Sequence, residues 1–338
     1  MNINNLPTGF LFVDEYEKGQ LETLSIGDYG KSFNIKADFL GHEKELNGVP
    51  NVNIMPLQEK WVVTLSTQYG CVMKCKFCDV PNVKFRGNVS VNDLKKQLYS
   101  ALDLVDVKYT DRLNIHYARM GEPSFNENVL IFSEWLAENK LTFQQDTGVR
   151  VETIHPVFTT MCPEYALLRE RLYRWVDIKN NLYNGQAGLQ LSINTTSEKQ
   201  RADMFDNSSL SLYEISNMVE GFPDPIGRKY CINIAYASGN EVDGEKLAAL
   251  FDVNKWMVKI TPIHNNTASI NNNIETIGGY ETYKPYLYPE ESCTKAGFDT
   301  LVFVPSEDEE RSLITCGNAI LGGSEFKEQK IQMVNFGN

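Results

Sequence analysis

The sequence predicts an α/β fold: a partial (β/α)6 barrel preceded by a small β-rich N-terminal element. From Trp61 onward, six apolar runs typical of strands alternate with helical segments, which indicates parallel strands with helices outside them. Residues 1–58 instead hold short β-type runs interrupted by Gly, Asn and Asp. Three cysteines directly follow the first barrel strand, where α/β barrels place their chemistry.

Local signals predict each element and the division into domains. The N-terminal β-type runs are residues 9–13 and 32–35. Helices are expected after a cap within Ser90–Asp93, at 127–139, at 163–175 with a first-turn proline, and within 280–297. Strands of the barrel are expected at 61–67, 112–118, 155–160, 188–193, 230–235 and 256–262. The predicted domains are 1–58, a barrel over 59–310, and a C-terminal segment over 311–338 with a Cys316 loop and a polar tail.

Composition narrows the class of protein. The 338 residues, 42% hydrophobic and 22% charged, suit a globular chain with a large core. No apolar run approaches about 18 residues and no signal peptide is apparent, so we expect a cytoplasmic protein without a membrane span. Seven cysteines, an odd number, indicate reduced thiols rather than a disulfide framework.

The net charge of the chain limits the kinds of binding partner that we expect. A net charge of −12 argues against broad, non-specific binding of nucleic acid. A local group of basic residues could still form an anion-binding rim around the cysteine loop, or a merely solvated surface. These residues are Lys74, Lys76, Lys84, Arg86 and Arg119.

Cys71, Cys75 and Cys78 are the most specific signal in the chain. Their C-x3-C-x2-C spacing on a loop after a strand brings three thiolates within reach of one metal centre and supplies no fourth. Structural zinc sites and ferredoxin-type clusters use four protein ligands, whereas three leave one metal position open. A zinc site completed by a remote Cys or His is the alternative interpretation.

With Phe77 before its last cysteine, this loop resembles the cluster loop of the radical S-adenosylmethionine (SAM) superfamily. The resemblance implies that Cys71, Cys75 and Cys78 ligate a [4Fe-4S] cluster. In that superfamily the cluster holds SAM and cleaves it reductively to a 5′-deoxyadenosyl radical. A reductant such as flavodoxin or ferredoxin is therefore an expected partner.

Further motifs, in order along residues 60–320, resemble the RlmN/Cfr-type rRNA adenine methyltransferases. They are Ser66 to Cys71, Met120-Gly121-Glu122-Pro123 with Asn126, Thr159-Thr160, Ser192-Ile193-Asn194, and Gly297-Phe298 followed by Thr315-Cys316-Gly317. The resemblance implies that Gly121, Glu122, Pro123, Thr160, Ser192 and Asn194 bind SAM, with the Glu122 carboxylate near the SAM ammonium. His264 follows the sixth strand and is predicted to face the same mouth, with Asn265 beside it.

In this family a methyl group carried by the C-terminal cysteine, here Cys316, is transferred to an adenine. A second cysteine, seven residues before the cluster loop, resolves the covalent adduct. That position is Thr64 here, and a threonine hydroxyl is far less acidic than a thiol. Either another residue acts as the base, or the radical serves a different reaction, or the site is degenerate; the second is favoured. The candidate bases are Cys231, Cys162, Cys293 and His116.

The sequence thus predicts a radical SAM, methyltransferase-like enzyme that uses Cys316 as methyl carrier. Its substrate is a nucleotide, an RNA or a small molecule. The acidic balance and an N-terminus unlike the family's helical RNA-recognition domain weaken ribosomal RNA. The alternatives are a non-catalytic metal-binding or regulatory homologue, and a radical SAM enzyme of another reaction class.

Overall fold

The fold is an α/β structure built on one large, mostly parallel sheet. The computed structural model describes residues 1–6, 8–27, 57–277, 284–305 and 307–327. Within them, ten strands run in the order β1-β2-β3-β4-β7-β8-β9-β10-β11-β12. From β4 on, each strand is parallel to the next. These strands are β4 (Trp61–Leu65), β7 (Tyr109–Tyr117), β8 (Arg150–Thr160), β9 (Gly188–Ser192), β10 (Tyr230–Tyr236), β11 (Trp256–Pro262) and β12 (Asp299–Val302).

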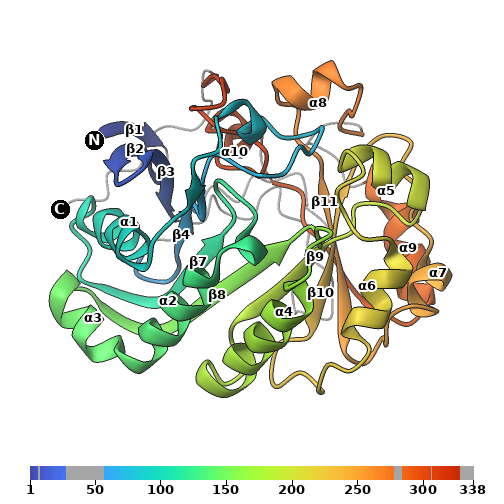
Figure 1. Ribbon diagram of the computed structural model, residues 1–338, viewed down its shortest axis with the longest axis horizontal. Coiled ribbons are helices and arrows are strands. Elements are labelled where there is room, and N and C mark those ends of the chain that lie inside the picture. The colour runs from blue at the N-terminus through green and yellow to red at the C-terminus, as the bar shows by residue number, and fades with distance from the viewer. Residues whose placement is uncertain (7, 28–56, 278–283, 306, 328–338) are drawn as a thin grey trace.

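All six strands expected for the barrel are present, and β12 follows them as a parallel strand that the sequence did not predict. Its segment, Asp299-Thr300-Leu301-Val302, is too short to show a strand pattern. Because strands follow one another around the sheet in chain order, all connections run the same way and their helices collect outside. Figure 1 shows α1 to α4, α6, α7 and α9 around the left, lower and right margins of the sheet.

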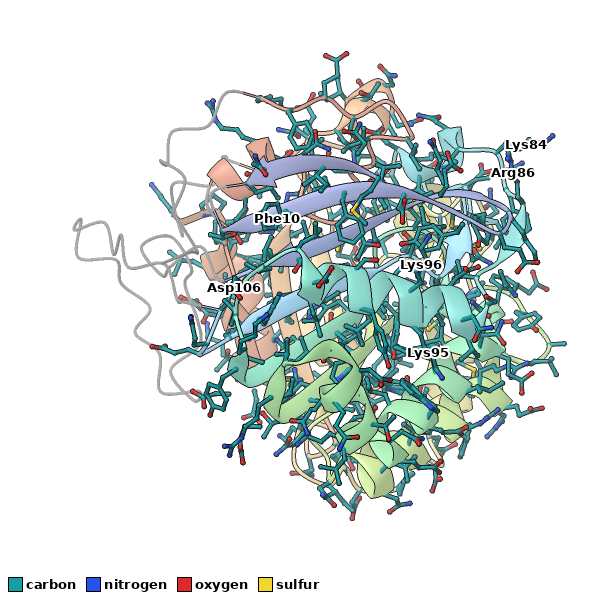
Figure 2. All side chains as sticks on the ribbon, turned by 90° about the vertical axis from the view of Figure 1, so that its left-hand side faces the viewer. Phe10, Lys84, Arg86, Lys95, Lys96 and Asp106 are labelled. Atoms are coloured by element: carbon teal, nitrogen blue, oxygen red, sulfur yellow. The ribbon has the colours of Figure 1, made fainter. Side chains whose placement is uncertain are left out.

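The N-terminal segment continues this sheet. Strands β1 (Asn2–Leu6), β2 (Gly9–Tyr16) and β3 (Gly19–Ile26) form an antiparallel meander, and β3 pairs antiparallel with β4 through Leu24 and Thr64. Figure 2 shows these strands crossing the molecule above α1. The β-type run expected at residues 32–35 lies outside the described residues, as do residues 328–338 of the polar tail. The domain division itself stays a prediction.

The helices are mostly where their signals indicate. Ser90 caps the first, accepting a hydrogen bond from the Asp93 amide, and Asn126 caps the second. The helix expected from Pro163 begins only at Leu168, because Pro163 forms a β-bridge with Ser209. Of the helix expected within 280–297, the described part is Leu287–Lys295. The helices are α1 (Val91–Asp103), α2 (Glu127–Glu138), α3 (Lys140–Thr147), α4 (Leu168–Asp177), α5 (Glu198–Met204), α6 (Leu212–Val219), α7 (Gly244–Ala248), α8 (Thr267–Asn271), α9 (Leu287–Lys295) and α10 (Glu307–Arg311).

The two faces of the sheet differ in chemistry. On β4, Trp61, Val63 and Leu65 are fully buried in the core beneath the helices. Thr64 points to the opposite, concave face and is in register with His116 on β7. Alternation thus separates an apolar face, covered by helices, from a concave face with polar side chains.

A buried ion pair ties the N-terminal strands to the parallel sheet. Arg119, just after β7, donates from Nη2 and Nε to Glu22 Oε2 on β3 at 2.7 and 3.0 Å. Arg119 Nη1 also donates to the Leu313 carbonyl at 2.6 Å, and Glu22 Oε1 accepts from the Leu321 amide at 2.7 Å. The pair therefore fastens three parts of the chain that are distant in sequence. It also removes Arg119 from the basic rim considered above.

We expect Arg119→Met to lower the free energy of unfolding by about 3–5 kcal/mol, because it leaves the Glu22 carboxylate buried and unpaired. Urea denaturation of the purified protein measures this. Arg174→Met is the matched control, since Arg174 pairs with Glu127 and Glu134 at the surface and such pairs contribute about 1 kcal/mol or less. Adding Glu22→Gln to Arg119→Met should recover part of the loss; equal losses in the Arg119 and Arg174 variants would contradict the assignment.

Candidate functional site

The three clustered cysteines lie at the carboxyl ends of the parallel strands. They follow β4 on a loop closed by the short hairpin β5 (Gln68–Tyr69) and β6 (Gly87–Asn88). The Cys75 Sγ lies 3.6 Å from the Met161 Sδ, beyond the end of β8. Cys71, Cys75 and Phe77 pack against a small apolar cluster from the ends of β8, β10 and β11 and from α5. Its buried members are Met73, Met161, Met204, Phe205, Ala237, Ile263 and Ile274.

These thiols are partly enclosed and act on one another electrostatically. Burial raises the pKa of Cys71 to about 12, while backbone N–H groups of Met73, Gly121 and Glu122 favour its thiolate. Burial and the charges of Cys78 and Cys71 raise the pKa of Cys75, and burial and Cys71 raise that of Cys78. The thiols therefore stay protonated at neutral pH unless a cationic group among them stabilises the thiolates.

The donor set fits an iron–sulfur cluster. Among the described residues, no three His, Cys, Asp or Glu side chains are arranged to hold a single metal ion. A [4Fe-4S] cluster makes a different demand, because each thiolate binds its own iron atom at a separate corner. Such clusters are bound by soft thiolate ligands in apolar surroundings.

Contacts from the far end of the chain hold the loop in shape. Asn266 Nδ2 donates to the Phe77 carbonyl at 2.8 Å, and Asn272 Nδ2 to the Lys76 carbonyl at 2.9 Å. The Phe77 ring also packs edge-on against Phe205, with ring centroids 5.5 Å apart. Both asparagines belong to the segment after β11, so the cysteine loop and this segment position each other.

Asp79 connects the cysteine loop with the Cys316 segment. Its buried carboxylate accepts hydrogen bonds from the Ala268 amide at 2.8 Å and the Ser324 hydroxyl at 2.7 Å. Its backbone amide donates to the Gly317 carbonyl at 2.8 Å. Cys316, which is exposed, therefore lies next to the loop, and its charge contributes to raising the pKa of Cys78.

Gly121 and Glu122 join β7 to β8. Gly121 has φ +97°, and a Cβ there would come within 2.6 Å of the Gln68 side chain, so only glycine fits. Glu122 is buried, and its carboxylate accepts from the Met161 and Ser124 amides at 3.0 and 3.1 Å. Burial raises the pKa of Glu122, while these bonds and the Thr160 hydroxyl oppose the rise. Pro123 begins the short 3₁₀ helix Pro123–Phe125.

The other predicted SAM ligands lie at neighbouring strand ends. Thr160 accepts from the Cys162 amide at 3.0 Å, and Ser192 lies partly exposed on the concave face. Asn194, at φ +65°, uses its side-chain oxygen to accept from the Ala235 amide at 3.0 Å. The His264 ring instead contacts Glu310 of α10, Nδ1 to Oε2 at 2.6 Å. The strand order brings these residues to one end of the sheet; their roles toward SAM stay predictions.

Arg201 on α5 organises this edge and was not predicted. Its guanidinium is buried and donates to the carbonyls of Ser192, Ile193 and Met161 at 2.7, 2.9 and 2.7 Å. These bonds fix where β8 and β9 end. No sequence pattern marks such a residue, because its partners are backbone carbonyls that lie eight or more positions away on other elements.

The concave face offers no thiolate in place of the missing cysteine. Burial raises the pKa of Cys231 to about 11 and those of Cys162 and Cys293 to about 12. His116, beside Thr64, has its pKa lowered to about 3 by burial and by nearby cations, so it is neutral and weakly basic. The explanation by a substitute base among these four residues therefore loses support.

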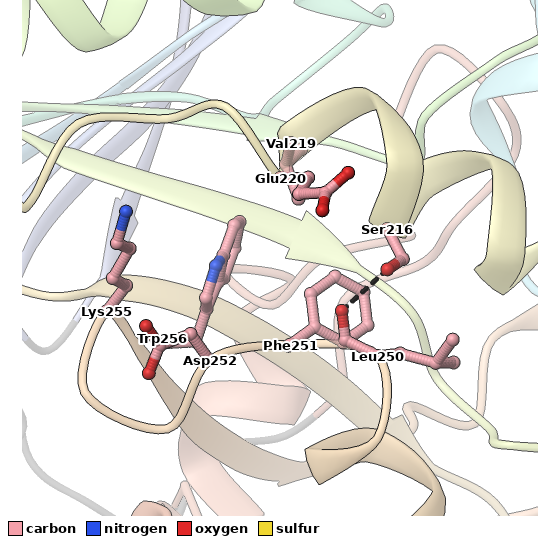
Figure 3. Close-up of a pocket in the computed structure, with 8 residues that line it drawn as sticks. All are labelled: Ser216, Val219, Glu220, Leu250, Phe251, Asp252, Lys255 and Trp256. Carbon is pink, nitrogen blue, oxygen red and sulfur yellow. Dashed lines mark hydrogen bonds between the residues drawn. The ribbon is translucent and has the colours of Figure 1, made fainter.

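One recess lies away from the cysteines. This recess of about 200 Å³ is lined by α6 and the segment before β11, including Ser216, Asp252 and Trp256 (Figure 3). It opens at the amino end of β11, opposite the cysteines, and Ser216 bonds the Leu250 carbonyl across it at 2.6 Å. Among the described residues, no group of metal ligands lines this recess.

The chain is similar to known methyltransferases in sequence and in fold. A probable dual-specificity RNA methyltransferase RlmN from Pseudothermotoga lettingae is 28% identical over 60% of this chain and 54% of its own length. The corresponding proteins of Malacoplasma penetrans and Desulfotalea psychrophila are each 33% identical, over 38% and 26% of this chain. A radical SAM methyltransferase from Sphaerobacter thermophilus has a crystal structure that matches 92% of this chain and 77% of its own with a TM-score of 0.59, at 15% identity. No family model matches the chain.

In sequence the chain is similar to proteins named as RlmN-type RNA methyltransferases, and in fold it is similar to a radical SAM methyltransferase. The likeness to the Sphaerobacter structure concerns the fold, given its low sequence identity. The chain spans about half the length of the Pseudothermotoga relative and 34% and 26% of the other two. In the described part of the chain, no helix has the length and apolarity needed to cross a membrane.

We expect Asp79→Ala to loosen the Cys316 segment, because it leaves the buried Ser324 hydroxyl without this acceptor, at a cost of about 1–3 kcal/mol. Limited proteolysis should then cleave faster within residues 311–324, while Asp79→Asn, which keeps one acceptor oxygen, should behave like the wild type. Unchanged cleavage in Asp79→Ala would show that other contacts hold the segment.

Acid should destabilise the protein through His116. Its pKa falls from 6.5 to about 3 on folding, so the unfolded state binds more protons and the free energy of unfolding declines as pH drops below 6.5 toward 3. His116→Asn should flatten that decline, as measured by urea denaturation between pH 4 and 7. Parallel pH profiles for the variant and the wild type would contradict a depressed pKa.

Proposed function

We propose that the protein is a radical SAM enzyme whose Cys71, Cys75 and Cys78 ligate a [4Fe-4S] cluster and whose Cys316 carries a methyl group toward the substrate. When bound, cluster and SAM would supply a 5′-deoxyadenosyl radical. The observation that carries the proposal is the place of Cys316. Although 238 positions separate it from Cys78, the Asp79–Gly317 hydrogen bond holds it beside the cysteine loop.

In this proposal the six strands β4 and β7 to β11 are the partial (β/α)6 barrel of radical SAM enzymes, with β12 added at its edge. Gly121, Pro123, Thr160, Ser192 and Asn194 would shape the SAM site. Glu122 would act through the hydrogen bonds that set the ends of β7 and β8, and its remaining lone pairs could accept from the SAM ammonium. His264 would support this mouth from outside, through Glu310. A flavodoxin or ferredoxin would supply the electron, in the cytoplasm.

Thr64 sets this protein apart from its relatives. Those relatives are named as RNA methyltransferases, and their relationship supports methyl or methylene transfer to a nucleotide, an RNA or a small molecule. Thr64 and the high thiol pKa values on the concave face support a step that does not need a resolving thiolate. A non-catalytic homologue is the second candidate, and the same Thr64 is the observation in its favour.

Anaerobic reconstitution with iron and sulfide, followed by dithionite and SAM, tests the proposal. We expect about four iron atoms per chain and release of 5′-deoxyadenosine. Zinc in place of iron, or an intact cluster that never cleaves SAM, would establish the non-catalytic alternative.

Mass spectrometry of the purified protein should find a methyl group on Cys316. Cys316→Ala should still form 5′-deoxyadenosine but lose the methyl group, whereas Cys293→Ala, which removes a thiol under α9, should keep both. An unmodified Cys316 in an enzyme that turns over would reject its role as methyl carrier.

A further inference from the structure

Arg201 on α5 carries a buried positive charge, and it forms no ion pair within the described part of the chain. Its guanidinium donates instead to the backbone carbonyls of Met161, Ser192, Ile193 and Leu210, at 2.7, 2.7, 2.9 and 3.0 Å. Burial lowers the pKa of Arg201 to about 10, so the side chain stays protonated at neutral pH. A buried cation is costly for a fold unless negative charge lies nearby.

One of these carbonyls belongs to a residue that touches the cysteine loop. The Met161 carbonyl accepts from Arg201 Nη2, and the Met161 Sδ lies 3.6 Å from the Cys75 Sγ. The Met161 amide donates to the Glu122 carboxylate at 3.0 Å, so this residue is held on both sides of its backbone. Met161 therefore connects Arg201 with Cys75 by direct contacts. The charge of Cys75 also reaches Arg201 and opposes the fall in the pKa of Arg201 that burial causes.

Helix α5 supports the cysteine loop by a second path. The Arg201 Cζ lies 4.8 Å from the centroid of the Phe205 ring, which packs edge-on against Phe77 of the loop at 5.5 Å. The Lys76 amide donates to the Met204 carbonyl at 3.0 Å. Met204 and Phe205 follow Arg201 by three and four positions at the end of the helix. The helix that carries the buried charge thus also holds the backbone of the cysteine loop.

Negative charges act on the loop thiols from other directions. Burial raises the pKa of Cys71, and the charge of Glu122 adds to the rise. Burial and Cys71 raise the pKa of Cys78, with further contributions from Asp79 and Cys316. A site that gathers several thiolates beside carboxylates needs positive charge in the protein around it.

The lysines of the loop itself are poorly placed to supply this charge. Lys74 is exposed to water, and Lys76 pairs with the exposed Asp203 at 2.6 Å. Water and the carboxylate weaken the fields of these two lysines. The Arg201 guanidinium is surrounded by protein atoms, where an electrostatic interaction is screened much less.

Lys179 is another buried cation without a carboxylate partner in the described chain, but it lies apart from the cysteines. It donates to the Ile226 carbonyl at 2.8 Å and to the Asn180 side chain at 3.1 Å, and it lies over the ring of Tyr230, where β10 begins. The strands begin at the end of the sheet opposite the cysteines. The contacts to Cys75 and Phe77, and not the lack of a carboxylate, therefore distinguish Arg201, and Lys179 is its matched control.

We propose that Arg201 is a positioning residue for the [4Fe-4S] cluster: it fixes the surroundings of Cys75 through Met161, and its buried positive charge raises the reduction potential of the cluster. This inference rests on the proposed function, which supplies the cluster. One electron from a flavodoxin- or ferredoxin-type donor adds one negative charge to the cluster, so a fixed cation nearby stabilises the reduced state more than the oxidised state. Net charge and the groups around the ligands are known to set the potentials of such clusters.

Redox titration of the anaerobically reconstituted full-length protein, followed by the electron paramagnetic resonance signal of the reduced cluster, measures the potential. Arg201→Gln removes the charge but keeps two N–H donors for the carbonyls. We expect it to shift the one-electron equilibrium about tenfold toward the oxidised cluster, which is a potential about 59 mV lower. Lys179→Gln should keep the wild-type potential. Circular dichroism and iron content confirm that each variant is folded and loaded.

Arg201→Lys keeps the inference testable even if Arg201→Gln does not fold. A buried amine has a pKa well below its usual value, so the introduced amine loses its proton at a lower pH than an exposed one. Relative to the wild type, the potential of Arg201→Lys should fall about as far as in Arg201→Gln as pH rises from 6 to 9. The acidic groups that face this position, Cys75, Cys162 and Glu198, are the same in both proteins, so the wild-type profile is the reference.

An intact cluster with the wild-type potential in Arg201→Gln would overturn the inference, as would an equal fall in Lys179→Gln. If Arg201→Gln is unfolded, a potential of Arg201→Lys that follows the wild type at every pH overturns it. A wild type that assembles no iron–sulfur cluster would reject the proposed function and this inference together. The expected shift in a protein that never releases 5′-deoxyadenosine would support the role of Arg201 and reject only the radical enzyme.

Discussion

The candidate site depends on one buried carboxylate, that of Asp79. Its position directly after Cys78 lets its amide hold the Gly317 carbonyl, while its side chain accepts from Ala268 and Ser324. These bonds bring together the loop after the first parallel strand, the segment after β11 and the segment that carries Cys316. These donors satisfy the buried carboxylate, which favours this placement of Cys316 relative to Cys71, Cys75 and Cys78.

A second constraint comes from the register of the sheet. Alternate residues of each parallel strand face the helices, and the residues between them face the concave side. Because neighbouring strands are paired in register, residues that face the same side line up across the sheet. Thr64, His116, Asn233 and Lys259 reach that side from strands far apart in the sequence. The Glu22–Arg119 pair extends the same frame to the N-terminal strands and to Leu313 and Leu321. The floor and the rim of the candidate site are thus built on one rigid sheet.

The frame places Thr64 in a defined neighbourhood. In the family that the sequence resembles, a cysteine stands at this position. On the concave face Thr64 is in register with His116, whose pKa is lowered by burial and by nearby cations, so the imidazole is neutral. Burial also raises the pKa of the Cys231 thiol on the same face. These surroundings favour a reaction without a resolving thiolate over the two-cysteine route.

Features that depend on local order could be predicted from the sequence. Six of the parallel strands, most helix starts, the cysteine loop and the likeness to RlmN proteins follow from periodicity, caps and short motifs. The remaining features became visible only in the folded chain. Tertiary packing added β12, joined the N-terminal strands to the sheet, directed the His264 ring to Glu310 and buried Arg119 against Glu22. These outcomes depend on contacts between residues that are 36 positions apart (Ile26 and Val62) to 194 positions apart (Arg119 and Leu313), and short-range patterns carry no information about such pairs.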